Sequence, residues 1–325
     1  MTEERPLPPE VRLRPYRGSD VRGIVDVWNR AMPQDPIDLG RWTKMVLCDS
    51  NFDPRGLLVA AVDGEVVGFA LAICRRIPLF GSDLETERGW ITAFGVAPQW
   101  RRRGIGSALL SAAERFVQAQ GRKEVLVSPY APNYFWPGVD PKAYPEAVEL
   151  LERRGYETLY SPVAMDKNLV GFFVPPEVEA LEAQRTREGY RFGPLAYEYL
   201  HDVIAFAEEA FNPDWGRAIR DAIKSGVPLD QCWIALSGEG RVVGFALFGG
   251  YDGILERFGP FGVDPSQRGK GLGKILLYRS LEAMRAKGAH GAWFLWTGEA
   301  TAAGQLYLKA GFAITRSFRV MRRRL

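Results

Sequence analysis

The sequence predicts an α/β protein built from two similar domains. A glycine-rich hexapeptide occurs twice, at 101–106 and 268–273, each time after an apolar run and before a helical pattern. A hairpin-like segment is also repeated, because 64–71 is echoed by 240–247. The length of 325 residues exceeds one usual core and gives each half enough chain for an α/β domain. We therefore expect two tandem domains, each with a mixed sheet flanked by helices.

Hydrophobic periodicity justifies the elements of the first half in order. Glycine 64 separates two β-rich runs, an apolar run precedes the first hexapeptide, and Leu109, Leu110, Ala113 and Phe116 recur at helical spacing before Gly121. The expected strands are 11–14, 57–62, 65–75, 90–96 and 124–128, and the expected helices are 20–30, 106–120 and 145–154.

The second half repeats this order. The same turn glycines, apolar runs and amphipathic patterns recur there. The expected elements are 191–195, 197–210, 233–236, 241–249, 255–263, 273–287, 292–296, 302–309 and 313–322. The first half has extra residues around 75–88 and 133–142, and inserted loops are where a repeated scaffold often acquires its own function.

Composition shifts set the expected domain boundaries. We expect an N-terminal domain at 1–166, a linker at 167–189 and a C-terminal domain at 190–325. The linker is polar and contains Pro175-Pro176 before a charged helix. The arginine-rich end of the chain alternates with apolar residues, which favours a final strand with a solvated arginine face over a nucleic-acid patch.

Charge and cysteine content exclude several classes of protein. The net charge of +3 is too small to indicate a nucleic-acid partner, and no apolar run is long enough to span a membrane. The segment 1–6 lacks the pattern of a signal peptide, so we expect a cytoplasmic protein. The three cysteines, Cys48, Cys74 and Cys232, lie far apart without metal-ligand spacing, so we expect no metal.

The two hexapeptides have the chemistry of a diphosphate loop. Their glycines let backbone N–H groups converge where a helix begins, and a helix N-terminus favours phosphate. A Walker loop would need glycine at Arg268 and Ser or Thr at Ile275, and a dinucleotide fingerprint would need glycine at Lys274. Both signatures fail.

The pattern that remains, Arg or Gln, two residues, Gly, one residue, then Gly or Ala, resembles the loop of the GNAT superfamily of acetyl-CoA-dependent N-acetyltransferases. The order of strands and helices in both halves is similar to the GNAT fold, in which two central strands splay apart below the loop. The resemblance implies acetyl-CoA as co-substrate, with the pantetheine on the splayed strand and the diphosphate on the loop. The implied residues in the second half are Phe261, Gly262, Val263, Arg268, Gly269, Lys270, Gly271, Leu272, Gly273 and Lys274. Those in the first half are Phe94, Gly95, Val96, Arg101, Arg102, Arg103, Gly104, Ile105, Gly106 and Ser107.

The resemblance also implies catalytic residues in the second half. Tyr307, one turn before Gly311-Phe312, stands where the family places a tyrosine that protonates the departing thiolate; the alternative is a tyrosine that only packs. Glu256, near the start of the splayed strand, is the candidate base for the amine; a solvated strand-end glutamate is the alternative. The first half departs from the pattern, because Leu151 stands where Tyr307 is expected.

The aromatic insertion of the first half has two interpretations. Its residues Tyr134, Trp136 and Asp140 are candidates for contact with the substrate, and docking against the other domain is the alternative. We expect an N-acetyltransferase that moves acetyl to a primary amine of a small molecule or peptide, with the second domain catalytic. The alternative is a catalytically silent acyl-CoA-binding sensor or assembly module.

Overall fold

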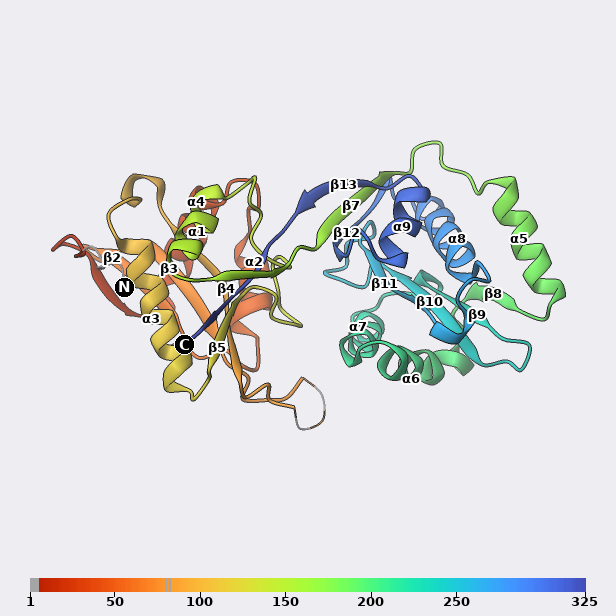
Figure 1. Cartoon of the computed structure of the whole chain (residues 1–325), viewed down its shortest axis with the longest axis horizontal. Coiled ribbons are helices and arrows are strands. Elements are labelled where there is room, and N and C mark those ends of the chain that lie inside the picture. The colour runs from red at the N-terminus through yellow and green to blue at the C-terminus, as the bar shows by residue number, and fades with distance from the viewer. Residues whose placement is uncertain (1–5, 80, 82) are drawn as a thin grey trace. The chain divides into compact units, whose positions relative to one another are not determined.

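The chain folds into two compact units. The computed structural model describes residues 6–79, 81 and 83–325. The N-terminal unit runs to Pro162 and also takes up Ser317–Leu325, whereas the C-terminal unit is Val163–Arg316 (Figure 1). The chain therefore passes between the units twice. Residues 1–5, which belong to the segment expected to lack a signal peptide, and residues 80 and 82 of the first insertion lie outside the described residues.

The described residues of the N-terminal unit form a seven-stranded sheet in the order β1-β2-β3-β4-β5-β14-β6. The pairs are antiparallel except β4 with β5, which is parallel. The strands are β1 Arg12–Pro15, β2 Leu57–Val62, β3 Glu65–Ile73, β4 Arg88–Val96, β5 Glu124–Val127, β6 Glu157–Tyr160 and β14 Val320–Arg324.

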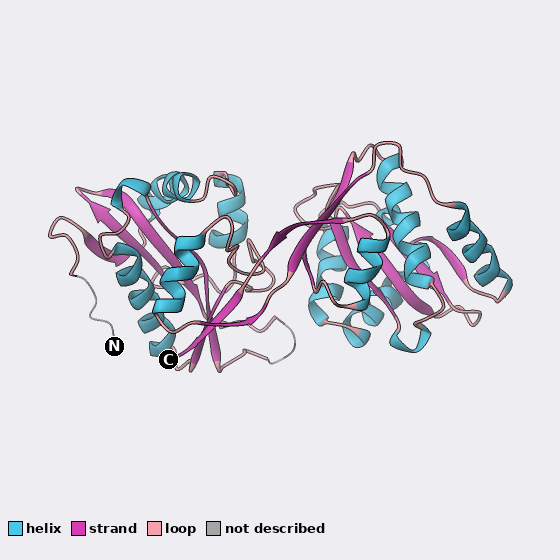
Figure 2. Cartoon of the chain, turned by 45° about the horizontal axis from the view of Figure 1, so that its top comes forward, coloured by secondary structure: helices cyan, strands magenta, loops and turns pink. Residues whose placement is uncertain are grey.

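Helices cover both faces of this sheet (Figure 2). Successive residues of β3 face opposite sides. Phe69 stacks on Trp28 at a centroid distance of 5.8 Å, whereas Ala70 packs in the cluster that contains Leu109. The helices are α1 Val21–Ala31, α2 Leu39–Trp42 with a π-helical turn at Thr43–Leu47, α3 Ile105–Ala119 and α4 Pro145–Arg153.

The C-terminal unit repeats this architecture with its strands divided between two sheets. Their orders are β11-β10-β9-β8 and β12-β7-β13. The strands are β7 Val163–Asn168, β8 Arg191–Pro194, β9 Cys232–Leu236, β10 Val242–Phe248, β11 Phe258–Val263, β12 Gly291–Thr297 and β13 Ala313–Ser317. The helices are α5 Pro176–Arg187, α6 Leu200–Ala210, α7 Pro213–Lys224, α8 Leu272–Ala286 and α9 Ala302–Lys309.

One strand near each crossing point completes the sheet of its unit. β14 lies between β5 and β6, with Met321 opposite Val127, and β7 lies between β12 and β13. The strand predicted over 313–322 is corrected, because it breaks into β13 and β14, which belong to different sheets. Gly138 lets the loop that contains it lie close to the backbone just before β14, since a Cβ on Gly138 would lie 2.5 Å from the carbonyl oxygen of Arg319.

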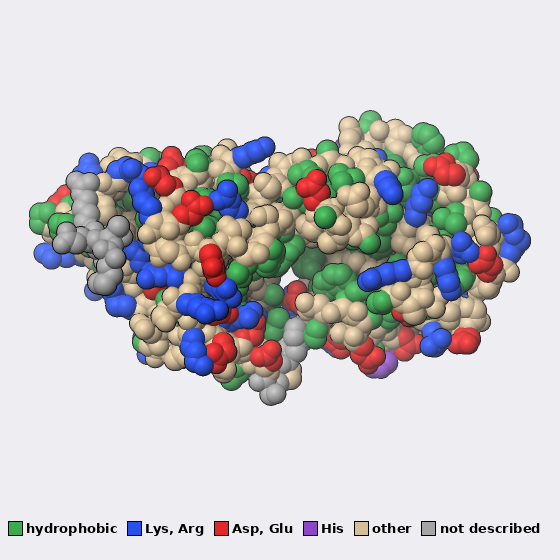
Figure 3. All heavy atoms as spheres, viewed as in Figure 1, with side chains coloured by type: hydrophobic (Ala, Val, Ile, Leu, Met, Phe, Trp, Pro, Cys, Tyr) green, Lys and Arg blue, Asp and Glu red, His purple; other side chains and the backbone are tan. Residues whose placement is uncertain are grey.

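The arginines of β14 are paired with acids of the N-terminal unit. Arg323 contacts Glu114 at 2.8 Å, and Arg322 contacts Glu157 at 2.6 Å. The alternation predicted an arginine face exposed to solvent, whereas these two arginines form ion pairs. On the face shown in Figure 3, basic and acidic side chains are interspersed. Of the helices in the described part of the chain, none has the length and apolar character needed to cross a membrane.

Candidate active site

Both glycine loops turn through left-handed residues directly before a helix. Gly269 and Gly271 have φ angles of 81° and 78°, and Gly271 is the N-cap residue of α8. Gly104, with a φ of 84°, is the N-cap residue of α3. The first N–H groups of a helix have no acceptor within it and carry partial positive charge, so each loop can hold a diphosphate.

The last glycine of each loop lets the helix approach the strand before the loop. A Cβ on Gly273 would lie 3.3 Å from the ring of Phe261 and 3.5 Å from Val263. A Cβ on Gly106 would lie 3.3 Å from Leu150 and 3.8 Å from Val96. A side chain at Gly273 would therefore crowd Phe261 on the strand, and one at Gly106 would crowd Leu150 on α4.

In the N-terminal unit, the strand before the loop separates from its parallel neighbour. β4 and β5 are paired from Arg88 and Glu124 to Ile91 and Val127. β4 continues to Val96, and on the β5 side no strand of the described residues pairs with it beyond Ile91. Its backbone is therefore available there to an extended ligand.

The C-terminal unit shows the same splay. β11 and β12 belong to separate sheets and meet at a single bridge between Arg257 and Trp293. The N–H of Trp293 donates to the carbonyl of Glu256 at 2.9 Å. Beyond that bridge, β11 pairs with β10 alone among the described strands, so the backbone of 261–263 faces the gap.

Tyr307 projects from α9 into an aromatic cluster beside the splayed strand. Its ring centroid lies 5.9 Å from Phe261, 6.1 Å from Phe258 and 4.4 Å from Phe294. Burial raises the pKa of Tyr307, so the phenol stays protonated at neutral pH. No described residue hydrogen-bonds its hydroxyl, which leaves that proton available to a base in the gap.

Glu256 lies at the start of the splayed strand. Its backbone carbonyl accepts the hydrogen bond that joins β11 to β12, and its residue is partly buried. No described residue forms an ion pair or hydrogen bond with its carboxylate, and the structure records no contact between Glu256 and Tyr307. The two candidates come from different parts of the unit, because Glu256 precedes β11 and Tyr307 lies on α9.

Two family profiles match the chain. One, described as "Acetyltransferase (GNAT) family", covers residues 22–134, and the other, "Acetyltransferase (GNAT) domain", covers residues 228–314. Each includes one glycine loop and the splayed strand before it. The chain belongs to the GNAT acetyltransferase family. It is an acetyltransferase with two tandem GNAT domains, and enzymes of this family use acetyl-CoA as co-substrate.

Curated relatives span most of the chain. The chain is 27% identical over 301 residues to a mycothiol acetyltransferase of Clavibacter michiganensis subsp. michiganensis, which covers 90% of this chain and 88% of the relative. It is 29% identical over 282 residues to a mycothiol acetyltransferase of Saccharomonospora viridis, which covers 80% of this chain and 81% of the relative.

Solved structures share the fold of the whole chain. A GCN5-related N-acetyltransferase from Sphaerobacter thermophilus has a TM-score of 0.71 at 18% identity, covering 98% of this chain and 97% of that one. A tandem GNAT protein from the clavulanic acid biosynthesis pathway has a TM-score of 0.65 at 16% identity, covering 97% of this chain and 98% of that one.

The N-terminal GNAT domain lacks both candidate catalytic groups. Leu150 and Leu306 take the same place beside the last loop glycine, so Leu151 occupies the place of Tyr307. Val96 and Val263 pair with the equivalent glycines Gly68 and Gly244, so Gly89 stands in the sequence where the other domain has Glu256. Leu151 is fully buried, and its apolar side chain offers no proton donor to the gap.

The aromatic insertion packs within the N-terminal unit. Trp136 stacks on Trp28 at a centroid distance of 5.2 Å. Asp140 is buried, and its Oδ1 accepts the N–H groups of Lys142 and Ala143 at 2.9 and 3.1 Å. Tyr134 is half-buried and has a partner of its own. The structure therefore gives Trp136 and Asp140 a role in holding the insertion together.

The segment expected as a linker contributes to the C-terminal loop. Nε of Arg185 on α5 donates to the carbonyl of Lys270 at 2.7 Å, and a Cβ on Gly271 would lie 2.7 Å from Leu181. Nζ of Lys270 lies 2.7 Å from the hydroxyl of Tyr190. Sequence reasoning missed these contacts because α5 is highly charged, and a charged helix after two prolines is typical of a linker.

Sequence reasoning also missed two buried arginines that pack against aromatic rings. Arg75 in the N-terminal unit and Arg257 in the C-terminal unit are 3% and 7% exposed. The alignment of the two repeats contains the signal for them, because it places an arginine of one copy opposite an aromatic residue of the other.

Proposed function

We propose that this enzyme transfers the acetyl group of acetyl-CoA to a primary amine, by direct attack within a ternary complex in the C-terminal domain. The observation that carries the proposal is the position of Tyr307 beside the splayed strand of the domain whose glycine loop turns through left-handed residues into α8.

The donor would be held by backbone groups. The N–H groups around Gly271 and Gly273 at the start of α8 would bind the diphosphate, and the backbone of 261–263 would pair with the pantetheine. The fit rests on the left-handed turn of the loop and on the strand edge that β12 leaves unpaired. Bound acetyl-CoA supplies an activated acyl carbon and a thiolate leaving group.

Glu256 and Tyr307 would handle the two protons. An alkyl ammonium has a pKa near 10, so it must lose a proton before it can attack, and the Glu256 carboxylate would accept that proton directly or through water. Tyr307 would hold its proton for the leaving sulfur. Burial raises the pKa of Tyr307, so the phenol would keep its proton until the thiolate forms, and burial would raise the basicity of that thiolate as well.

The N-terminal domain would hold CoA without turnover. Its glycine loop and splayed strand support binding, whereas Leu151 and Gly89 stand where the proton donor and base are expected. If neither domain transferred an acetyl group, the whole protein would be a silent acyl-CoA-binding sensor, which is the alternative function.

A screen of amines against the intact protein with acetyl-CoA tests the proposal. The panel should include acceptors of the mycothiol type, because relatives with that name span most of the chain. Mass spectrometry would detect the acetylated product. Transfer to at least one amine supports the enzyme, and acetyl-CoA binding by calorimetry without transfer to any amine supports the sensor.

A further inference from the structure

Arg257 is a buried cation without an acidic partner. Its residue is 7% exposed, and its guanidinium carbon lies 5.2 Å from the ring centroid of Tyr251 and 4.6 Å from that of Trp293. Its Nε is buried and lacks a hydrogen-bond partner, and no carboxylate of the described residues lies within ion-pair distance. The two rings compensate part of the cost of burying this cation, and a ligand that accepts a hydrogen bond from Nε would compensate more of it.

The N-terminal unit also pairs an arginine with an aromatic residue at the equivalent place, but there the arginine and the aromatic residue have exchanged sequence positions. Val96 and Val263 pair with equivalent hairpin glycines, Gly68 and Gly244. Trp90 and Arg257 each lie six residues before the valine, and Arg75 and Tyr251 each lie seven residues after the glycine. The guanidinium carbon of Arg75 lies 5.1 Å from the ring centroid of Trp90 and 4.9 Å from that of Tyr130, so in each domain a buried arginine packs against two aromatic rings at this position.

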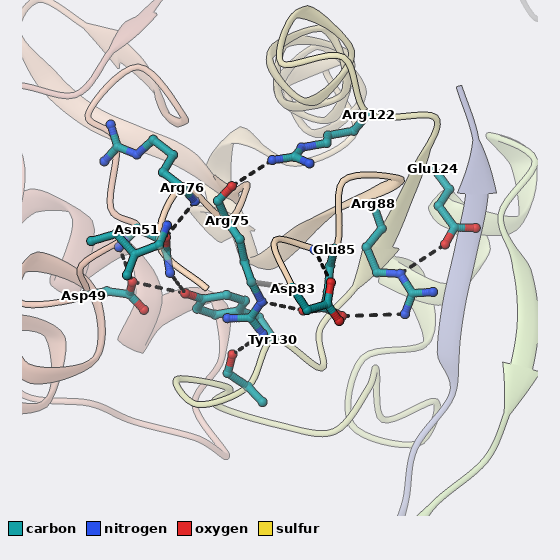
Figure 4. Close-up of polar contacts among 12 residues, drawn as sticks. Asp49, Asn51, Arg75, Arg76, Asp83, Glu85, Arg88, Arg122, Glu124 and Tyr130 are labelled. Carbon is teal, nitrogen blue, oxygen red and sulfur yellow. Dashed lines mark hydrogen bonds and ion pairs between the residues drawn. The ribbon is translucent and has the colours of Figure 1, made fainter. Parts of the chain in front are cut away.

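The two arginines differ in how their charge is neutralised. Arg75 forms an ion pair with Glu85, and its Nη2 donates to the carbonyl of Ala131 at 2.6 Å (Figure 4). Glu85 lies in the insertion that the C-terminal copy lacks. Asp252, the acid of the shorter connection there, is exposed and is not a partner of Arg257.

Arg257 also lies at the base of the splayed strands. Phe258 and Phe294 face the side of the sheet on which Tyr307 and α8 lie. Their chain neighbours Arg257 and Trp293 face the opposite side, since successive strand residues alternate. The donor loop precedes α8, so Arg257 lies on the face opposite the donor loop, which is the face that α6 and α7 line beside Phe245.

We propose that Arg257 is a subsite for a carboxylate on the acceptor, so that the substrate is a primary amine that also carries a carboxylate, as an amino acid does. The inference rests on the proposed function. The acceptor carboxylate takes the place that Glu85 occupies beside Arg75, and the amine lies toward Glu256. The flat guanidinium, fixed between two rings, is preorganised for a bidentate contact with a carboxylate.

Matched acceptors test the subsite. The intact protein is assayed with acetyl-CoA and a series of ω-amino acids of increasing chain length, each compared with its own amide. We expect kcat/KM to favour one of the acids over its amide by roughly tenfold to a hundredfold, the usual size of a hydrogen-bonded charge contact. Arg257→Met should remove that preference, and Arg257→Lys should retain part of it. Equal rates for acids and amides would overturn the subsite while leaving the transferase intact.

A second measurement separates binding from turnover. Calorimetry with the same acids and amides reports on the subsite even if no amine is acetylated, so the proposed function and the subsite can fail independently. Binding of an acid by the wild-type protein that is lost in Arg257→Met supports the subsite. Equal binding by the two proteins contradicts it.

Arg75→Met is the matched control for a purely structural role. Methionine keeps much of the volume between the rings but not the charge. Arg75→Met removes the closer partner of Glu85 and leaves it with Arg88 at 3.8 Å, so it should lower Tm and leave the ratio of acid to amide rates unchanged. Arg257→Met removes an unpaired charge, so Tm should stay close to the wild-type value. If Arg257→Met lowers Tm as much as Arg75→Met does and leaves the acid preference unchanged, Arg257 is structural and the proposal fails.

Discussion

The rings of Tyr307 and Phe294 lie 4.4 Å apart between centroids, which ties the candidate acid to β12 on the far side of the gap from β11. Tyr307→Phe keeps this packing and removes only the hydroxyl. We expect kcat to fall by roughly a hundredfold or more, with acetyl-CoA affinity nearly unchanged. Stability should not fall, because no described residue hydrogen-bonds the hydroxyl that is lost. An unaltered kcat would show that Tyr307 only packs.

The pH dependence of the reaction gives a second test of Tyr307. Burial raises the pKa of Tyr307 above its ordinary value of 10.0, so the acid form persists as the pH rises. We expect kcat/KM to increase with pH as the amine loses its proton, with no decline caused by Tyr307 below about pH 10. The measurement is a rate profile of the wild-type protein and Tyr307→Phe. A descending limb below about pH 9 that disappears in the variant would contradict the assignment.

The last glycine of each loop offers a matched test of the two domains. Gly273→Val and Gly106→Val keep ordinary helical backbone but place a side chain between the helix and the splayed strand. By contrast, Gly271 and Gly104 require positive φ, so valine there would strain the loop itself. Gly273→Val should abolish turnover, and Gly106→Val should remove at most one bound CoA.

Turnover and bound CoA per chain are measured in the intact protein, by rate assay and calorimetry. Circular dichroism confirms that both variants are folded. If Gly106→Val stops turnover and Gly273→Val does not, catalysis belongs to the N-terminal domain.

The sequence predicts those parts of the fold that depend on local chemistry. Left-handed glycines before an amphipathic helix mark both loops, and the tyrosine one turn before Gly311 leads to Tyr307. The predicted strands and helices around them lie within a few residues of the observed bounds. The roles of Tyr307, Glu256 and the loop residues stay predictions.

Long-range pairing could not be predicted in the same way. The alternation of β14 identifies a strand, but it does not show which sheet that strand completes. The environment of Arg257 depends on the register of two hairpins, and the docking of α5 depends on contacts of Leu181 and Arg185 with a distant loop. A fragment that begins at residue 190 would therefore lack both β7 and α5.

The position of β14 leads to the last prediction. Met321 is fully buried in the N-terminal unit, whereas Ile314 on β13 is 39% exposed in the C-terminal unit. Met321→Ala should lower the free energy of unfolding by about 2–5 kcal/mol, the usual cost of this truncation in a core. Ile314→Ala is the control and should change it by less than about 1 kcal/mol. Hydrogen exchange locates the effect: amides of β5, which pair with β14, should exchange faster in Met321→Ala, and those of β12 should not. Faster exchange in β12 with β5 protected would place the end of the chain in the other sheet, because an apolar truncation loosens first the strands that pack against it.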